Sequence, residues 1–139
     1  MNSTNNALYI VYTKESGRMA LTEYQYFDMI NKIKTLHRED GPSVELINGY
    51  RAWYINGKRH RTDGPAIINA NGSELWYKEG IHHRIDGPAT VWPSGRVFWL
   101  IEDKEYSKED FDKLIQEARD MPLVLRLIDP RKWVREYKS

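Results

Sequence analysis

Short runs of β-branched and aromatic residues alternate with turn-forming residues over the middle of the chain. Ala66–Ile68 and Leu75–Tyr77 are two such runs, and they flank Asn71-Gly72. Runs of this kind around Asn-Gly are typical of β-hairpins, because a type I′ turn requires a positive φ at both of its central residues. The same arrangement surrounds Asn48-Gly49 and Ser94-Gly95, which predicts three hairpins.

The pattern repeats itself at a step of 23 residues, from His37 to His60 to His83. Each copy begins with His-Arg-x-Asp-Gly-Pro followed by Ser or Ala. The glycines Gly49, Gly72 and Gly95 and the tryptophans Trp53, Trp76 and Trp99 keep the same step. Agreement at this many positions indicates repetition of one supersecondary unit.

The Asp-Gly-Pro of each copy is expected to make the second connection of the unit. Asp can accept a hydrogen bond from the backbone two residues on, Gly can take a positive φ, and Pro cannot extend a central ladder. Two strands per unit then predict an antiparallel β-meander that grows by hairpins. The third copy departs from the pattern, because Asp103 stands where the earlier copies have Gly57 and Gly80.

The N-terminal flank predicts a strand and a helix. Leu8–Tyr12 has strand composition, Glu15–Gly17 is a turn, and Arg18–Leu21 is a possible partner strand. Thr22 and Gln25 form a capping-box pattern that starts a helix. The residues expected on its apolar side are Tyr26, Phe27, Met29, Ile30 and Ile33.

The C-terminal flank predicts helices. Ser107 starts one that Met121-Pro122 ends, and its apolar positions Phe111, Leu114, Ile115 and Ala118 follow helical spacing. Residues 122–128 form an apolar run that is either strand or helix. Asp129-Pro130 then opens a last short helix with Trp133, Val134 and Tyr137. Such helices suit the capping of an open repeat array, although they could instead cover one face of the sheet.

The predicted fold class is therefore α+β, an antiparallel β-meander of three 23-residue hairpin repeats with flanking helices. Residues 1–36 hold the N-terminal strand and helix, 37–106 the repeats, and 107–139 the C-terminal helical cap. The chain has 139 residues, 40% hydrophobic, and no cysteine, which predicts a single domain without disulfides or thiolate metal sites.

Charge and hydropathy narrow the function classes. The 21 basic residues nearly balance the 20 acidic ones, which argues against a nucleic-acid binder that uses its whole surface. The polar start Met1–Asn6 does not resemble a secretory signal, and no apolar run approaches the length of a membrane span. We expect a soluble, cytoplasmic protein.

The repeating histidines raise the question of a metal site. Equivalent residues two strands apart lie roughly 10 Å apart, whereas two nitrogens on one zinc ion are at most about 4.2 Å apart. His37, His60 and His83 are therefore not expected to converge. His82 and His83 are neighbours in a strand, and neighbours point to opposite faces. We predict no metal, no cofactor, and structural roles for these histidines.

The recurring His-Arg-x-Asp could also suggest acid–base catalysis, which needs one His held beside a reacting atom. A constellation repeated in register is better explained by the fold, with Arg38, Arg61 and Arg84 bound to turn aspartates or to backbone carbonyls. We predict no catalytic residue and no enzyme activity. The positions assigned to the repeat structure are His37, Asp40, Gly41, Trp53, His60, Asp63, Gly64, Trp76, His83, Asp86, Gly87 and Trp99.

The aromatic residues occupy both faces of the predicted strands. Trp53, Trp76 and Trp99 form a ladder, and Tyr54, Tyr77 and Leu100 lie on the opposite face. One face must pack on something, and the helices around Phe27 and Phe111 are candidates. The other face is either covered too or a binding surface. Core packing is the simpler interpretation of the tryptophans, whereas exposed aromatics beside Arg would suit protein hot spots or stacked bases.

Two basic clusters complete the candidate sites. Lys58–Arg61 is one, and the C-terminal segment is the other. The candidate partner-binding residues are Lys58, Arg59, Arg61, Arg131, Lys132, Trp133 and Arg135. Lys and Arg could contact nucleic-acid phosphates here, although a solvated face or a patch for an acidic protein is the simpler interpretation.

The segment Trp53–Ala66 reads Trp-Tyr-x-Asn-Gly-Lys-x-His-Arg-x-Asp-Gly-Pro-Ala, and it resembles the MORN-like repeat of many bacteriophage and large-DNA-virus proteins. Trp76–Ala89 matches less well, because Glu79–His82 replaces Asn-Gly-Lys. Asp103–Phe111 is similar to the end of such arrays. The resemblance covers residues 37 to about 111. It implies a viral origin and a binding role, because MORN-type units chiefly serve as binding surfaces and small phage proteins often counter host defences.

The first hypothesis is therefore a non-enzymatic interaction protein that binds and inhibits a host protein, in the host cytoplasm if the chain is viral. The alternative is a nucleic-acid or nucleotide binder that uses Lys58, Arg59, Arg61 and the basic C-terminal segment. An enzyme ranks third.

Overall fold

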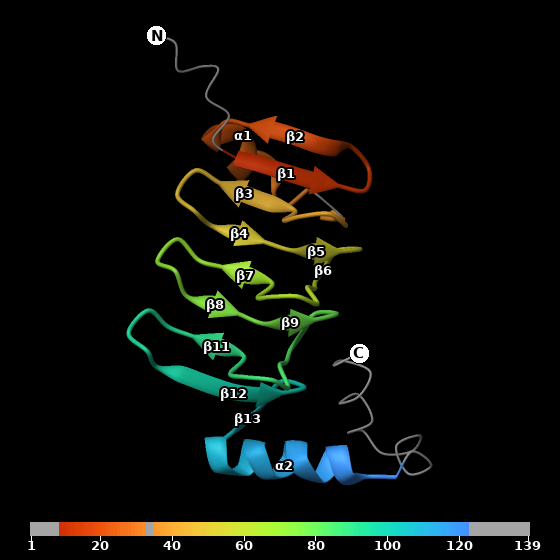
Figure 1. The fold of residues 1–139 in the computed structure, drawn as a ribbon. Helices are drawn as coiled ribbons and strands as arrows, with labels where there is room; N and C mark the ends of the chain where they lie inside the picture. Colours follow the sequence, from red (N-terminus) through yellow and green to blue (C-terminus); the bar gives the residue numbers. More distant parts are fainter. Residues whose placement is uncertain (1–8, 33–34, 123–139) are drawn as a thin grey trace.

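A nine-stranded antiparallel sheet dominates the computed structural model, which describes residues 9–32 and 35–122. Its strands lie in the order β13-β12-β11-β8-β7-β4-β3-β1-β2, so the chain adds most strands in sequence order (Figure 1). Their bounds are β1 Tyr9–Thr13, β2 Gly17–Leu21, β3 Val44–Leu46, β4 Arg51–Ala52, β7 Ile67–Ile68, β8 Glu74–Leu75, β11 Thr90–Val91, β12 Val97–Ile101 and β13 Lys104–Tyr106. The predicted antiparallel β-meander with a C-terminal helix is confirmed.

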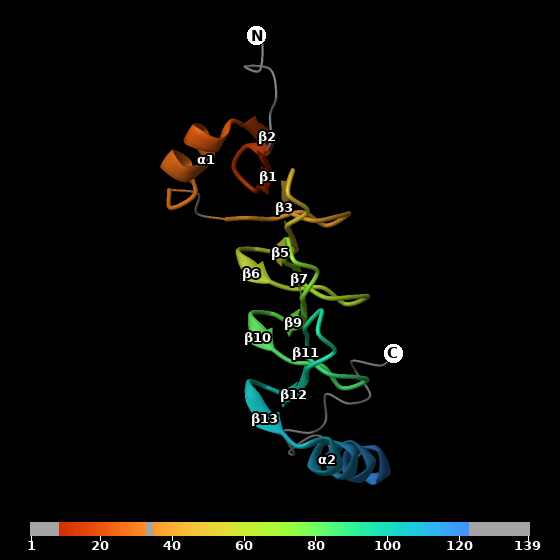
Figure 2. The same ribbon diagram turned by 90° about the vertical axis from the view of Figure 1, so that its left-hand side faces the viewer.

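Two small hairpins lie beside this sheet. β5 (Tyr54–Ile55) pairs with β6 (Lys58–Arg59), and β9 (Tyr77–Lys78) pairs with β10 (Ile81–His82). Figure 2 shows β6, β10 and β13 on the same side of the sheet as the N-terminal helix α1. The prediction of two strands per unit was wrong, because the first two units each add a side hairpin and the third adds β13 to the main sheet.

The loops at Asn48-Gly49, Asn71-Gly72 and Ser94-Gly95 differ from the predicted type I′ turns. Only the glycines have positive φ there, 93° at Gly72 for example. The Gly72 amide donates to the Asn69 carbonyl at 2.9 Å, and the Asn69 amide donates to the Ser73 carbonyl at 2.9 Å. This is the pattern of a three-residue loop with a glycine bulge, so Asn71 needs no positive φ.

The type I′ turns lie instead at the tips of the side hairpins. Asn56 and Gly57 have φ values of 51° and 80°, and Glu79 and Gly80 have 50° and 84°. In the third copy Glu102 and Asp103 take 49° and 70°, so Asp103 occupies the glycine position with a positive φ. Asp is one of the few residues with a side chain that tolerate this region.

The helices begin where the capping patterns predict. α1 (Glu23–Met29) has a complete Thr22–Gln25 capping box, and α2 (Lys108–Asp120) is capped by Ser107 and ends at Met121. Phe27, expected on the apolar side of α1, is 62% exposed, which corrects that assignment. Ile33 and everything predicted from Leu123 onwards lie outside the described residues.

Two hydrophobic clusters hold the ends of the array. Tyr26 and Met29 of α1 pack on a cluster centred on Val11, Val44 and Ile67, on one face of the sheet. α2 packs beyond the last strands, with Phe111, Ile115 and Ala118 buried against Ile85 and Ile101. One helix thus covers part of a face, and the other closes an end (Figures 1 and 2).

Candidate partner-binding surface

The arginine of each His-Arg-x-Asp-Gly-Pro segment is held inside the fold. The Arg61 guanidinium carbon lies 3.9 Å from the Trp53 ring centroid, Nε donates to Asp63 at 2.9 Å, and Nη1 donates to the Pro65 carbonyl at 3.0 Å. Arg84 repeats these contacts on Trp76, Asp86 and Pro88, and Arg38 repeats them on Tyr12, Asp40 and Pro42. The cation–π contacts of Arg61 and Arg84 therefore join consecutive units, while the charge-assisted hydrogen bonds fix each arginine within its own unit.

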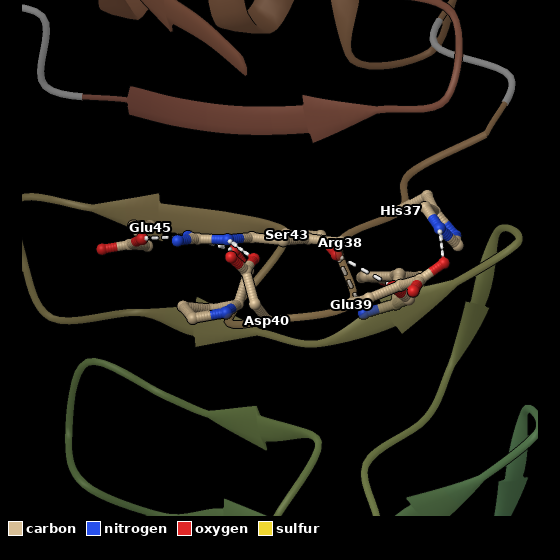
Figure 3. Close-up of polar contacts among 8 residues, drawn as sticks. His37, Arg38, Glu39, Asp40, Ser43 and Glu45 are labelled. Atoms are coloured by element: carbon tan, nitrogen blue, oxygen red, sulfur yellow. Dashed lines mark hydrogen bonds and ion pairs between the residues drawn. The ribbon is translucent and has the colours of Figure 1, made fainter. Parts of the chain in front are cut away.

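The first copy adds an acidic partner. Arg38 Nη1 donates to Glu45 at 3.1 Å, as Figure 3 shows beside the Asp40 contact. The position 23 residues after Glu45 is Ile68, so this ion pair has no counterpart in the next unit. Arg38 also lowers the pKa of the Asp40 carboxyl through its hydrogen bond.

The glycine of Asp-Gly-Pro is required by close approach, not by its backbone angle. A Cβ on Gly64 would lie 2.7 Å from Arg61 Cζ, and the same contact would be 2.8 Å at Gly41 and 2.6 Å at Gly87. None of the three has a positive φ, so that part of the prediction was wrong. In each unit the arginine guanidinium occupies the space that a side chain at the glycine position would need.

The repeating histidines accept backbone hydrogen bonds from the next hairpin tip. The Glu79 amide donates to His60 Nδ1 at 3.0 Å, the Asn56 amide to His37 Nδ1 at 2.9 Å, and the Glu102 amide to His83 Nδ1 at 3.0 Å. A protonated Nδ1 could not accept these bonds. Burial lowers the pKa of His60, and it lowers that of His83 to about 4. Each histidine therefore binds the hairpin tip of its own unit, 19 residues further along the chain.

Trp53 and Trp76 lie where one unit meets the next, and Trp99 lies where the last unit meets α2. Trp53 and Trp76 are covered by arginines, whereas Trp99 meets α2, with the Phe111 ring centroid at 4.9 Å and Lys108 Nζ at 5.3 Å from its ring. The cation of α2 takes the place that an arginine has in the earlier units. This arrangement agrees with a packing role for the ladder.

The opposite face carries a row of half-buried tyrosines that pack on the core of the first two units. We call this row the tyrosine band; it consists of Tyr9, Tyr26, Tyr50, Tyr54 and Tyr77. Tyr9 and Tyr26 stack with centroids 4.8 Å apart. Tyr77 stacks on His82, its cross-strand neighbour, at 4.7 Å. Phe27 extends the row at the α1 end.

The hydroxyl groups of the band lie close enough to influence one another. Burial raises the pKa of Tyr50 to about 12, helped by Tyr54 and Tyr26. Burial also raises the pKa of Tyr26, again with Tyr54 contributing. Tyr26 and Tyr50 are therefore neutral hydroxyl donors at physiological pH.

Arg59 brings a positive charge to the band. It stands directly opposite Tyr54 in the β5–β6 hairpin, and its guanidinium carbon lies 5.1 Å from the Tyr77 ring centroid. Hydrogen bonding to Tyr54 raises the pKa of Arg59. Arg59 and its exposed neighbour Lys58 form no ion pair with another residue of the described ranges.

The predicted partner-binding residues divide into three groups. Lys58 and Arg59 are exposed beside the band. Arg61 is committed to Trp53, Asp63 and Pro65, and we leave it out of the contact surface. Arg131, Lys132, Trp133 and Arg135 lie outside the described residues. Sequence reasoning did not single out Tyr9, Tyr26 and Tyr50, although Tyr54 and Tyr77 were placed opposite the tryptophans.

A cavity of about 460 Å³ lies between the Arg38 and Arg61 loops, and its lining includes Trp53 and Asp63. Within residues 9–32 and 35–122 we find no group of three or more metal-ligating side chains. No helix in the same ranges is long and apolar enough to cross a membrane.

Comparisons with protein-family models, with curated proteins and with solved structures find no match for this chain.

Proposed function

We propose that this chain is a non-enzymatic protein-binding module whose contact surface is the tyrosine band with Arg59. The observation that carries the proposal is the concentration on one face of five half-buried tyrosines and Arg59, which forms no ion pair with another described residue. Tyr and Arg are enriched among the residues that dominate binding energy in protein interfaces. Tyrosine also loses little conformational entropy when it becomes fixed in a complex.

The division between fold and surface supports this assignment. The repeated His, Arg, Asp and Trp side chains bind one another and the backbone, so the motif that looks most like a catalytic constellation is occupied by structural contacts. The rings of the tyrosine band pack on the hydrophobic core, and the band does not contain the repeated His, Arg and Asp contacts that hold the units together. A rigid scaffold with an aromatic face suits recognition.

The resemblance of Trp53–Ala66 to MORN-like repeats extends the proposal to a biological role. We propose that three 23-residue units form a MORN-like array with a helix at each end. We further propose that the protein is phage-encoded and inhibits a host defence protein by binding it in the host cytoplasm. The resemblance is the support for this step, because recognition chemistry alone does not identify a host.

The direct test is affinity capture with three immobilised forms of the full chain. These are the wild type, the double variant Tyr54→Ser/Tyr77→Ser, and the control Ile47→Ser, which removes a residue that is 73% exposed. A host protein retained by the wild type and the control but lost by the double variant would support the proposal. Equal retention by all three folded forms would contradict it.

A second candidate function is nucleic-acid binding, favoured by the stacking of Arg59 on Tyr77 next to Lys58. Basic and aromatic side chains together are typical of single-strand binding surfaces. Fluorescence anisotropy with a twelve-nucleotide oligothymidylate tests it. Binding that weakens steeply with salt and needs Arg59 would favour this candidate over the first.

A further inference from the structure

The polar groups of the tyrosine band around Arg59 are hydrogen-bond donors and carry a positive charge. Tyr54 stands opposite Arg59 in the β5–β6 hairpin, and the Arg59 guanidinium carbon lies 5.1 Å from the Tyr77 ring centroid. Tyr50 packs on the same hydrophobic cluster as Tyr54 and Tyr77. Phenol hydroxyls and guanidinium N–H groups can all donate hydrogen bonds, and the guanidinium cannot accept any. The cluster therefore matches a ligand group that accepts several hydrogen bonds and carries negative charge.

Arg59 forms no ion pair with another described residue, in contrast to the three arginines of the His-Arg-x-Asp-Gly-Pro segments. Arg38, Arg61 and Arg84 each bind a carboxylate at 2.8–2.9 Å. Arg59 contacts a hydroxyl and a ring instead, and Lys58 adds a second exposed cation on the same short strand. No carboxylate of residues 9–32 or 35–122 pairs with this charge, which leaves the Arg59 guanidinium able to bind a carboxylate of a partner.

We infer that the tyrosine band binds an acidic segment of a protein partner, with a Glu or Asp carboxylate of that segment held by Arg59 and the surrounding tyrosine hydroxyls. The inference rests on the proposed protein-binding function and names its partner chemistry. Arg forms bidentate hydrogen bonds with carboxylates, which gives geometric specificity. An apolar residue beside the carboxylate would pack on the rings of Tyr54 and Tyr77.

The first and the last hairpin of the array differ in charge, which decides where an acidic segment binds. Lys58 and Arg59 make the β5–β6 hairpin basic, whereas the tip and last strand of β12–β13 carry Glu102, Asp103 and Glu105 beside a single lysine. Leu100 and Glu105 stand opposite each other where the first hairpin has Tyr54 and Arg59. An acidic ligand is therefore attracted to the first hairpin and repelled by the last.

A short blocked peptide, Glu-Leu-Glu-Glu-Leu-Glu, is the probe, and its Gln-for-Glu analogue is the neutral control. Binding to the full chain is measured by NMR titration, which reports both affinity and location. The matched variants are Arg59→Ala and Arg96→Ala, because Arg96 is also exposed and lies 5.2 Å from an aromatic centroid, that of Phe98.

The expected result is shifts centred on Tyr54, Arg59 and Tyr77, with at least a tenfold loss of affinity in Arg59→Ala and less than a twofold loss in Arg96→Ala. The neutral peptide should bind at least tenfold more weakly than the acidic one. Equal binding of the two peptides, or equal loss in the two variants, would overturn the inference.

Two further measurements distinguish an acidic peptide from nucleic acid and from a second copy of the chain as the ligand of the band. A six-nucleotide oligothymidylate that binds the band more tightly than the acidic peptide would assign the site to nucleic acid and overturn the inference. Light scattering that shows a dimer lost in Arg59→Ala would assign it to a second copy, with the same consequence. A captured host protein that needs Tyr54 and Tyr77 but not Arg59 would overturn the acidic-segment inference while the proposed function stood.

Discussion

The Arg84 guanidinium carbon lies 3.6 Å from the centroid of the Trp76 ring, so an arginine of one unit covers the indole of the unit before it. The same guanidinium lies against Gly87, where a Cβ would stand 2.6 Å from it. One side chain thus explains three recurring residue types: an aromatic residue to lie on, an acid to bind, and a glycine that leaves room.

Gly64→Ala should destabilise the protein by about 1–3 kcal/mol, because the new methyl would overlap the Arg61 guanidinium in a packed position. Urea denaturation measures the change. In an Arg61→Ala background the same substitution should cost less than about 0.5 kcal/mol, since the overlapping group is gone. Additive losses would show that Arg61 is not the reason for the glycine.

Gly72→Val should cost roughly 1 kcal/mol or more for a different reason. Gly72 has a φ of 93°, and a Cβ there would meet no atom within 4 Å, so the loss comes from backbone strain alone. Ala70→Val, in the same exposed loop, should stay within about 0.5 kcal/mol of the wild type. Equal melting temperatures for the two variants would remove the positive-φ explanation.

Stability should fall as the pH is lowered from about 6.5 to about 4. Burial lowers the pKa of folded His83 to about 4, below its ordinary 6.5, so the stability that its neutral form contributes is fully present above pH 6.5 and is lost towards pH 4. Linkage limits this contribution to about 3 kcal/mol. The burial that lowers the pKa of His60 acts in the same direction.

His83→Asn separates this effect from general acid denaturation. The asparagine Oδ1 stands at the place of the histidine Nδ1, so it can still accept the Glu102 amide hydrogen bond, but it does not titrate. Urea denaturation at pH 8, 6, 5 and 4 should give a visibly shallower decline for the variant. An unchanged slope would mean that other groups cause the acid sensitivity.

Phe111→Ala should destabilise the C-terminal end by about 3–5 kcal/mol, because Phe111 is 3% exposed and packs on Trp99. In an array in which each unit contacts mainly its neighbours, this loss should remain local. Hydrogen exchange should accelerate in β12 and β13 while β1 and β2 keep their protection. Uniform acceleration throughout the sheet would contradict the end-cap role of α2.

The meander and the helix starts could be predicted because they depend on local signals. Asn71-Gly72 and the Ser107 cap act over a few residues, and both lie at chain reversals or helix ends as expected. The turn types were wrong because Asn-Gly occurs twice in the first unit, at Asn48-Gly49 and at Asn56-Gly57, and the two pairs adopt different turns. The type I′ turn is at Asn56-Gly57, where both residues have a positive φ.

The tyrosine band could be predicted only in part, since it depends on which distant strands become neighbours. Tyr54 and Tyr77 share a repeat position, so their common face followed from the period. Tyr9, Tyr26 and Tyr50 come from β1, α1 and a loop end, and no period relates them. For Arg61 the sequence predicts bonds to a turn aspartate or a backbone carbonyl and also a place among the candidate contact residues. The fold shows the bonds to Asp63 and Pro65, which leaves Arg59 as the arginine of the band.

Hydrogen–deuterium exchange of the full chain, alone and bound to the captured host protein, tests the central claim most directly, because it locates the contact without substitutions. The account predicts slower exchange on binding in Tyr50–Arg59 and Tyr77–His82, where the tyrosine band and its side hairpins lie. The Arg-x-Asp-Gly-Pro loops, Arg38–Pro42 and Arg61–Pro65, should exchange as in the free protein. Protection of those loops with no change along the band would contradict the account and move the recognition surface to the opposite face.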